Sequence, residues 1–207
     1  MPRVLIATSN PGKLRDFTAA AAEFGVEIAP VPAIEQLPAV VEDGATFEAN
    51  AQKKAEHYSR LAGGEMVLAD DSGLEVDALG GAPGVRSARY AAVGNEENST
   101  DAENNRRLLG ELREVGETQR GARFVCVIVA ARDGRVLASF RGTAEGRLLA
   151  APRGYNGFGY DPLFYFPSLG KTFAQLTAGE KAHVSHRGQA FRKFLEWFQL
   201  QEEAISN

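Results

Sequence analysis

The chain has 207 residues, of which 44% are hydrophobic and 24% are charged, a balance typical of a globular protein with a substantial buried core. Its formal net charge of −4 gives no overall attraction to nucleic acid or to an anionic membrane, so we expect neither as a partner. No apolar run approaches the roughly 20 residues that a membrane span needs. The opening residues, MPRVLIATSN, have too short an apolar core for a secretory signal, and we therefore expect a cytoplasmic protein.

Strands and helices alternate in the first third of the chain. Residues 3–7 (RVLIA) predict a buried strand, and Asn10 followed by Pro11 predicts the cap and first residue of a helix that ends at about residue 24. The pattern then predicts a strand over 26–31, a helix over 46–61 and a strand over 66–69, which runs into the sequence DDSG.

The remaining chain is richer in strands. Thr100 and Glu103 form a capping-box pair that predicts a helix to about residue 113. Two β-rich segments, 123–131 and 136–149, are joined by Asp133-Gly134, which predicts a hairpin. The last helix carries a stripe that should pack on the core: Phe191, Phe194, Leu195 and Phe198. We therefore expect an α/β protein with a second, hairpin-rich lobe, and a buried structural thiol at the single cysteine, Cys126.

The segment TSNPGK, Thr8 to Lys13, joins the first strand to the first helix. Backbone N–H groups at the helix start, the positive end of the helix dipole and Lys13 together predict an anion site. Strand–cap–helix turns are also common without any ligand, so an ordinary turn is the alternative.

The segment DDSG places two adjacent carboxylates after a predicted strand. Such a pair suits a hard cation such as Mg²⁺. In an extended chain the two side chains point in opposite directions, so only one of them is expected to face the site. Asp70 has a structural alternative, in which it bonds the backbone of a turn. Glu42 is a candidate for the second metal-directed carboxylate, or is a plain loop acid.

Several cations converge on the same chemistry. Lys54 lies one helical turn after Asn50, so both share a face of the predicted second helix. Three further residues come from the C-terminal segment: Lys181, His186 and Arg187. Cations near a carboxylate-bound metal are what a triphosphate requires.

The segment GFGYDP provides Phe158 and Tyr160 beside glycines that allow close backbone approach. The two rings suit stacking on a base, with Asp161 as a hydrogen-bond acceptor. The alternative is a hairpin corner packed with aromatic side chains.

Five segments together resemble one family in order and spacing. They are TSNPGKLRDF, VEDGATFEANAQKKA, ADDSGLEVDALGGAPGVRSARYA, GFGYDPLF and LTAGEKAHVSHRGQA, and the family is the inosine/xanthosine triphosphate pyrophosphatases of Ham1/RdgB type. The resemblance implies one α/β domain over 1–207 with an elongated mixed sheet and two lobes around a central active-site cleft. It also implies a homodimer that uses Mg²⁺ to hydrolyse ITP, dITP and XTP to the monophosphate and pyrophosphate.

The resemblance also implies roles for individual residues. Asp71 should be the proton acceptor and a metal ligand, with Ser72 beside it on the substrate; Glu42 should be the other metal-directed acid and Lys54 a catalytic lysine. The first motif should contact the triphosphate, through Thr8, Ser9, Asn10, Pro11, Gly12 and Lys13. The remaining substrate contacts should be the base-binding strip Phe158, Gly159, Tyr160 and Asp161, and the closing contacts Lys181, His186 and Arg187.

The sequence departs from the family pattern at two positions. Asp16 stands where the first motif usually ends in Glu, which keeps the charge and shortens its reach. Glu48 is separated from Asn50 by Ala49, so on a helix it faces about 100° away from the expected position.

Two other functions fit parts of the same pattern. One is a nucleotide-binding regulator without turnover, and the other is a pyrophosphatase that removes modified pyrimidine nucleotides.

Overall fold

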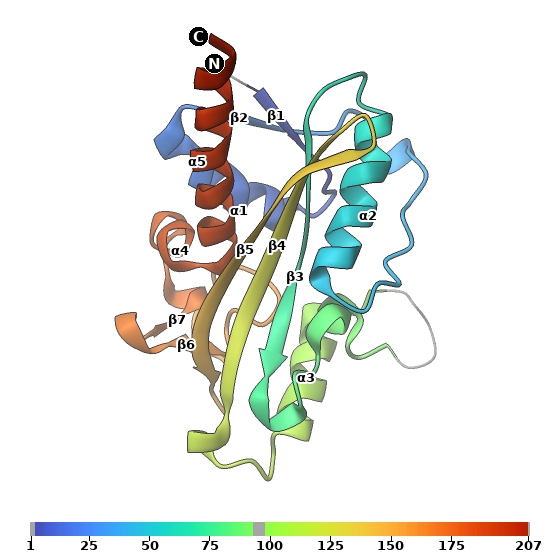
Figure 1. The fold of residues 1–207 in the computed structure, drawn as a ribbon. Helices are drawn as coiled ribbons and strands as arrows, with labels where there is room; N and C mark the ends of the chain where they lie inside the picture. Colours follow the sequence, from blue (N-terminus) through green and yellow to red (C-terminus); the bar gives the residue numbers. More distant parts are fainter. Residues whose placement is uncertain (1–2, 93–97, 207) are drawn as a thin grey trace. The chain divides into compact units, whose positions relative to one another are not determined.

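The computed structural model of the chain describes residues 3–92 and 98–206 (Figure 1). The chain forms two compact units, which are described separately below. Unit 1 comprises Met1–Asp71, Cys126–Thr143 and Ala182–Asn207, and unit 2 comprises Ser72–Val125 and Ala144–Lys181.

Among the described residues, seven strands are hydrogen-bonded in the order β2-β1-β3-β4-β5-β6-β7. Their bounds are β1 Arg3–Ile6, β2 Glu27–Pro30, β3 Val67–Val76, β4 Gly121–Arg132, β5 Arg135–Leu148, β6 Phe164–Phe166 and β7 Lys171–Thr172. Strand β1 is parallel to β2 and β3, whereas β6 is antiparallel to β5 and β7. The sheet is therefore mixed, and the predicted α/β fold class is confirmed.

In the described part of unit 1, three helices begin at caps encoded in the sequence. They are α1 Pro11–Ala21, α2 Phe47–Arg60 and α5 His186–Ser206. Asn10 caps α1 and Thr46 caps α2 through its side-chain oxygen, as helix starts prefer. Helix α1 is shorter than predicted, because its last residues tighten into a 3₁₀ turn, Ala22–Phe24, before Gly25 adopts a left-handed conformation (φ 63°).

An aromatic core packs α5 against α1, which lie side by side (Figure 1). The rings of Phe17 and Phe191 have centroids 5.4 Å apart, and Phe194 and Leu195 are fully buried. The predicted aromatic stripe of the last helix is therefore confirmed as core. Cys126 is fully buried in the same cluster, and burial raises the pKa of its thiol, as expected for a structural cysteine.

The predicted hairpin joins β4 to β5. Asp133 and Gly134 both have positive φ (51° and 77°), as a tight two-residue turn between twisted strands requires. Ser59 of α2 accepts a hydrogen bond from the Gly134 N–H at 2.9 Å, which anchors the turn within unit 1.

Unit 2 contains α3 Asp101–Glu111, and α4 Ala178–Val184 begins in unit 2 and ends in unit 1. The Thr100–Glu103 capping box at the start of α3 is confirmed. The rings of Phe124, Phe164 and Phe173 pack together, with centroids 4.6 to 5.7 Å apart. None of the helices among the described residues is long and apolar enough to cross a membrane.

Tyr90 of unit 2 should make the free energy of unfolding depend on pH in the alkaline range. Burial and the hydrogen bond from its hydroxyl to Glu111 raise the pKa of Tyr90 to about 12, above its usual value of 10.0. Because the folded pKa is the higher one, this stabilisation is complete below pH 10 and disappears as the pH rises through 12. We expect Tyr90→Phe to be about 1 kcal/mol less stable than the wild type at pH 8, a difference that shrinks towards pH 12.

Urea unfolding at several pH values measures this effect. Tyr155→Phe is the matched control, because the Tyr155 side chain is exposed; it should follow the wild type at every pH. A stability difference for Tyr90→Phe that stays constant from pH 8 to pH 12 would contradict the assignment.

Candidate active site

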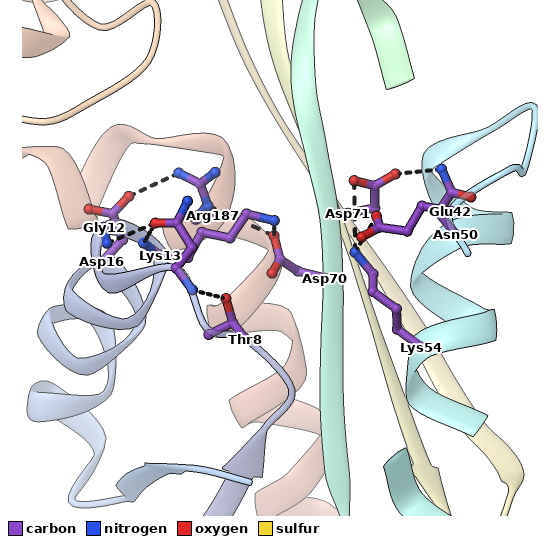
Figure 2. Close-up of polar contacts among 11 residues, drawn as sticks. Thr8, Gly12, Lys13, Asp16, Glu42, Asn50, Lys54, Asp70, Asp71 and Arg187 are labelled. Atoms are coloured by element: carbon purple, nitrogen blue, oxygen red, sulfur yellow. Dashed lines mark hydrogen bonds and ion pairs between the residues drawn. The ribbon is translucent and has the colours of Figure 1, made fainter. Parts of the chain in front are cut away.

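Two acids in β3 organise the charged residues of unit 1. Asp70 and Asp71 are consecutive in an extended strand, so their side chains point to opposite sides, as predicted (Figure 2). The prediction that the strand ends at Ala69 is wrong, because the buried Leu74 and Val76 continue it beyond the acids. Both carboxylates therefore project from regular strand rather than from a loop.

Asp71 faces α2 and the loop that carries Glu42 (Figure 2). Asn50 donates a hydrogen bond from Nδ2 to Asp71 Oδ2 at 3.0 Å. Lys54 Nζ lies 2.7 Å from Glu42 Oε2 and 4.0 Å from Asp71 Oδ1. The predicted shared face of Asn50 and Lys54 is confirmed, while Glu48 is exposed.

Asp70 faces the start of α1 and the start of α5. Its Oδ2 lies 2.9 Å from Lys13 Nζ and 3.9 Å from Arg187 Nε, and Arg187 also binds Asp16 at 3.0 Å. Asp70 is 1% exposed. Asp70 lies inside β3 and not in a turn, and its carboxylate holds two cations.

The two adjacent acids have opposite pKa shifts. Burial disfavours ionisation of Asp70, but the charges of Lys13, Arg187 and Lys54 outweigh it and hold the pKa of Asp70 below its usual range. For Asp71, burial prevails over Lys54, Lys13 and Asn50, so its pKa is raised. With a lowered pKa, Asp70 keeps its charge more readily than an ordinary aspartate. With a raised pKa, Asp71 is the better proton acceptor of the two.

Lys54 stays charged although it is buried. Burial disfavours its ammonium form, but the charges of Asp71, Glu42 and Asp70 outweigh it and raise the pKa of Lys54. Lys54 is therefore a fixed cation beside Asp71.

The TSNPGK turn is stabilised by hydrogen bonds between its own residues. Asn10 Oδ1 accepts hydrogen bonds from the N–H groups of Gly12 and Lys13, at 2.8 and 3.1 Å, and Thr8 Oγ1 accepts from the Asn10 N–H at 3.2 Å. Two of the N–H groups from which an anion site is predicted, those of Gly12 and Lys13, are therefore already bonded within the turn. Ser9, Asn10 and Pro11 are exposed.

The start of α5 is packed closely against its neighbours in unit 1. Ser185 Oγ accepts a hydrogen bond from the Gly188 N–H at 3.1 Å and so caps the start of α5. A Cβ on Gly188 would lie 1.7 Å from the carbonyl oxygen of Ala182, and a Cβ on Gly142 would lie 2.1 Å from that of His186. Glycine at both positions therefore allows the backbone segments to approach closely, and this close packing fixes the backbone that carries the buried His186 and Arg187.

Within unit 2, the segment predicted to bind a base forms a second cluster, and it includes Lys181, which was predicted among the cations for the triphosphate. Lys181 Nζ lies 2.7 Å from Asp161 Oδ2 and 5.0 Å from the centre of the Phe158 ring. The side chains of Lys181 and Asp161 are only 6% and 4% exposed. Phe158 is half-buried and its N–H also donates to Asp161, at 3.0 Å. Ser72, which follows Asp71 in β3, is half-buried.

Of the two rings predicted to stack on a base, Tyr160 has a different place. It is buried, and its hydroxyl donates to the carbonyl of Ser87 at 2.8 Å. This bond supports the segment GFGYDP. Two residues of α3 bind the backbone of Gly159. Its N–H donates to the Asp101 carboxylate at 2.7 Å, and its carbonyl accepts from Asn105 Nδ2 at 2.9 Å. Sequence reasoning missed these two residues, although their spacing of four on a capped helix places them on one face.

The unit 1 site can accept a cation. The three cations Lys13, Lys54 and Arg187 face four carboxylates, those of Asp16, Glu42, Asp70 and Asp71, so the group carries an excess of one negative charge. Within residues 3–92 and 98–206, no group of three or more His, Cys, Asp or Glu is arranged to hold a metal ion. Mg²⁺ commonly takes one or two carboxylates and completes its shell with water and phosphates, which fits the Glu42 and Asp71 pair.

A mixed α/β sheet with buried carboxylates and fixed cations at the start of a helix is typical of proteins that act on phosphate-bearing ligands. The chain belongs to the Ham1 family, whose sequence model matches residues 4–197. The resemblance identified from the five motifs is therefore confirmed.

Similar proteins cover nearly the whole chain. A protein of Acidobacterium capsulatum named dITP/XTP pyrophosphatase is 49% identical over 194 residues, which are 92% of this chain and 95% of that protein. One of the same name from Geobacillus kaustophilus is 48% identical over 196 residues, covering 95% of this chain and 94% of that protein. The structure of a HAM1 protein from Coxiella burnetii matches with a TM-score of 0.81 and 38% identity, covering 96% of this chain and 99% of that one.

Proposed function

We propose that this protein hydrolyses the non-canonical purine nucleoside triphosphates dITP, ITP and XTP to the nucleoside monophosphate and pyrophosphate. Membership of the Ham1 family and the names of the similar proteins support this reaction. The homodimer implied by the resemblance stays a prediction.

The observation that carries the proposal is the environment of Asp71. It is a buried carboxylate of raised pKa, hydrogen-bonded to Asn50 and 4.0 Å from the ammonium of Lys54. A carboxylate in these surroundings is suited to accept a proton from water while the adjacent cation stabilises negative charge on a phosphate.

In the proposed step, a water molecule loses a proton to Asp71 and attacks the α-phosphorus. The new bond joins the water oxygen to phosphorus, and the bond from phosphorus to the bridging oxygen breaks, so that pyrophosphate leaves with the electron pair. Lys54 faces the developing charge, and Lys13 and Arg187, held by Asp70, bind the phosphates. Glu42 and Asp71 would hold Mg²⁺, which when bound supplies positive charge to the phosphate oxygens.

Selection of the base is assigned to the unit 2 cluster around Phe158, Asp161 and Lys181. A 6-oxo purine presents an acceptor at C6 and a donor at N1, whereas adenine presents the reverse. A site arranged for the first pattern leaves buried groups unpaired with adenine, at a cost of roughly 1 to 3 kcal/mol for each mismatched group. We therefore expect ATP to be a poor substrate.

Turnover of six nucleotides with Mg²⁺ tests the proposal: ITP, XTP, dITP, GTP, ATP and dUTP. We expect ITP, XTP and dITP to yield equal amounts of monophosphate and pyrophosphate, each with kcat/KM at least about tenfold above that for ATP. Monophosphate is measured by chromatography, and pyrophosphate and phosphate by separate enzymatic assays.

Each alternative gives its own result in the same assay. Tight binding of ITP without turnover would identify a regulator, and preference for dUTP would identify a pyrimidine-directed enzyme. Release of single phosphate in place of pyrophosphate would contradict attack at the α-phosphorus.

A further inference from the structure

We propose that Asn50 is a positioning residue that ties the Glu42 loop to Asp71 and thereby sets the two carboxylates for Mg²⁺ and water. This inference rests on the proposed function, and it adds a residue whose role lies in the placement of the two acids. Asn50 itself is 1% exposed and comes from the first turns of α2.

Both ends of the Asn50 amide are engaged within unit 1. Its Nδ2 donates to Asp71 Oδ2 at 3.0 Å, and its Oδ1 accepts a hydrogen bond from the Gly44 N–H at 2.7 Å. Gly44 lies two residues after Glu42, whose carboxylate is 2.7 Å from Lys54 Nζ. One side chain therefore links the loop of one candidate metal ligand to the carboxylate of the other. Figure 2 shows the bond from Asn50 to Asp71.

The chemistry of the link requires an amide. The Gly44 N–H needs an acceptor, and the Asp71 carboxylate needs a donor, and among short side chains Asn supplies both from one planar group. The same contacts define which oxygen of Asp71 faces which partner, because Oδ2 is held by Asn50 and Oδ1 lies towards Lys54. An Asp at position 50 would keep the bond to Gly44 and place a like charge against Asp71.

Gly44 is shaped for the same link. A Cβ at this position would lie 2.5 Å from Asn50 Oδ1 and 3.0 Å from the Ala49 Cβ. Any side chain at Gly44 must therefore displace either the loop or the Asn50 amide. The backbone φ of Gly44 is not in the left-handed region, so Ala at this position perturbs the link through contact with Asn50.

The test compares Asn50→Ala, Gly44→Ala and the double variant. For each protein we would measure Mn²⁺ binding without nucleotide by electron paramagnetic resonance, the Mg²⁺ concentration for half-maximal turnover of ITP, kcat and KM. We expect each single variant to weaken Mn²⁺ binding about tenfold and to lower kcat about 10- to 100-fold, while KM for ITP stays within about threefold. Both changes break the same link. The double variant should therefore lose no more Mn²⁺ affinity and no more kcat than the single variant with the larger loss.

Gly110→Ala is the matched glycine control, since an added Cβ there meets nothing within 4 Å, and it should equal the wild type in every measurement. Asn50→Asp, an isosteric change, is compared with Gln52→Glu, which adds the same charge on the exposed face of α2. We expect Asn50→Asp to lower kcat about 10- to 100-fold and Gln52→Glu to leave it unchanged.

Three outcomes would overturn the inference. The first is Mn²⁺ binding and kcat of Asn50→Ala and Gly44→Ala within twofold of the wild type. The second is fully additive effects in the double variant, and the third is normal kcat for a folded Asn50→Asp. A wild type that binds Mn²⁺ but hydrolyses no nucleotide would refute the proposed function alone; the Mn²⁺ comparison would still decide the role of Asn50.

Discussion

Asp71→Asn should lower kcat for ITP by about 10²- to 10⁴-fold, while the protein stays folded and still binds the nucleotide. The physical reason is that an amide cannot accept the proton of the attacking water. A general base typically contributes a factor of this size to the rate. The amide is isosteric with the carboxylate, and its oxygen can accept the hydrogen bond from Asn50 that Asp71 Oδ2 accepts in the wild type. Steady-state turnover and equilibrium binding of ITP measure the two quantities separately.

The matched control for this variant is Asp43→Asn. Asp43 follows Glu42 in the same loop, pairs with Lys53 at the surface, and has a side chain that is 65% exposed. It should change kcat by less than twofold. An Asp71→Asn protein with near-normal kcat would remove Asp71 from the role of proton acceptor, and one that loses nucleotide binding in proportion to turnover would assign it to binding instead.

Local features of the fold could be predicted from the sequence because they depend on neighbours in the chain. The caps at Asn10 and Thr100 and the turn at Asp133-Gly134 each follow from hydrogen bonds or backbone angles within a few residues. The aromatic stripe of α5 follows from helical periodicity. All of these predictions are confirmed.

The pairing of charges could not be predicted in the same way. Arg187 binds Asp16, and the two residues are 171 positions apart. The sequence identifies both as charged, but only the three-dimensional fold makes Asp70 and Asp16 the partners of Lys13 and Arg187. The cations that were expected to bind a phosphate are already held by carboxylates. If they bind a phosphate as proposed, the phosphate must exchange or share these partners.

The same arrangement explains why two adjacent aspartates can differ in chemistry. Alternation along β3 sends Asp70 towards two cations and Asp71 towards an amide and one lysine. The resulting pKa shifts have opposite signs. Strand geometry thus gives two adjacent acids different partners, and this difference supports the proposed role of Asp71 as the proton acceptor.

The Asp161–Lys181 pair of unit 2 should support both stability and nucleotide binding. Because the two side chains are almost completely buried and 2.7 Å apart, removal of one leaves an uncompensated buried charge. We expect Asp161→Asn and Lys181→Met each to lower the free energy of unfolding by about 3–5 kcal/mol, measured by urea denaturation. We also expect each to raise KM for ITP at least about tenfold, because both groups belong to the proposed base-binding cluster.

The double variant separates these two contributions. With both charges removed, the unfolding free energy should recover to within about 1–2 kcal/mol of the wild type, whereas KM for ITP should stay raised. Lys171→Met is the matched control, since Lys171 forms a 2.9 Å ion pair with Glu180 but its side chain is 43% exposed, and it should cost no more than about 1 kcal/mol. Recovery of KM together with stability in the double variant would make the pair a structural element of unit 2 and would assign base recognition to other residues.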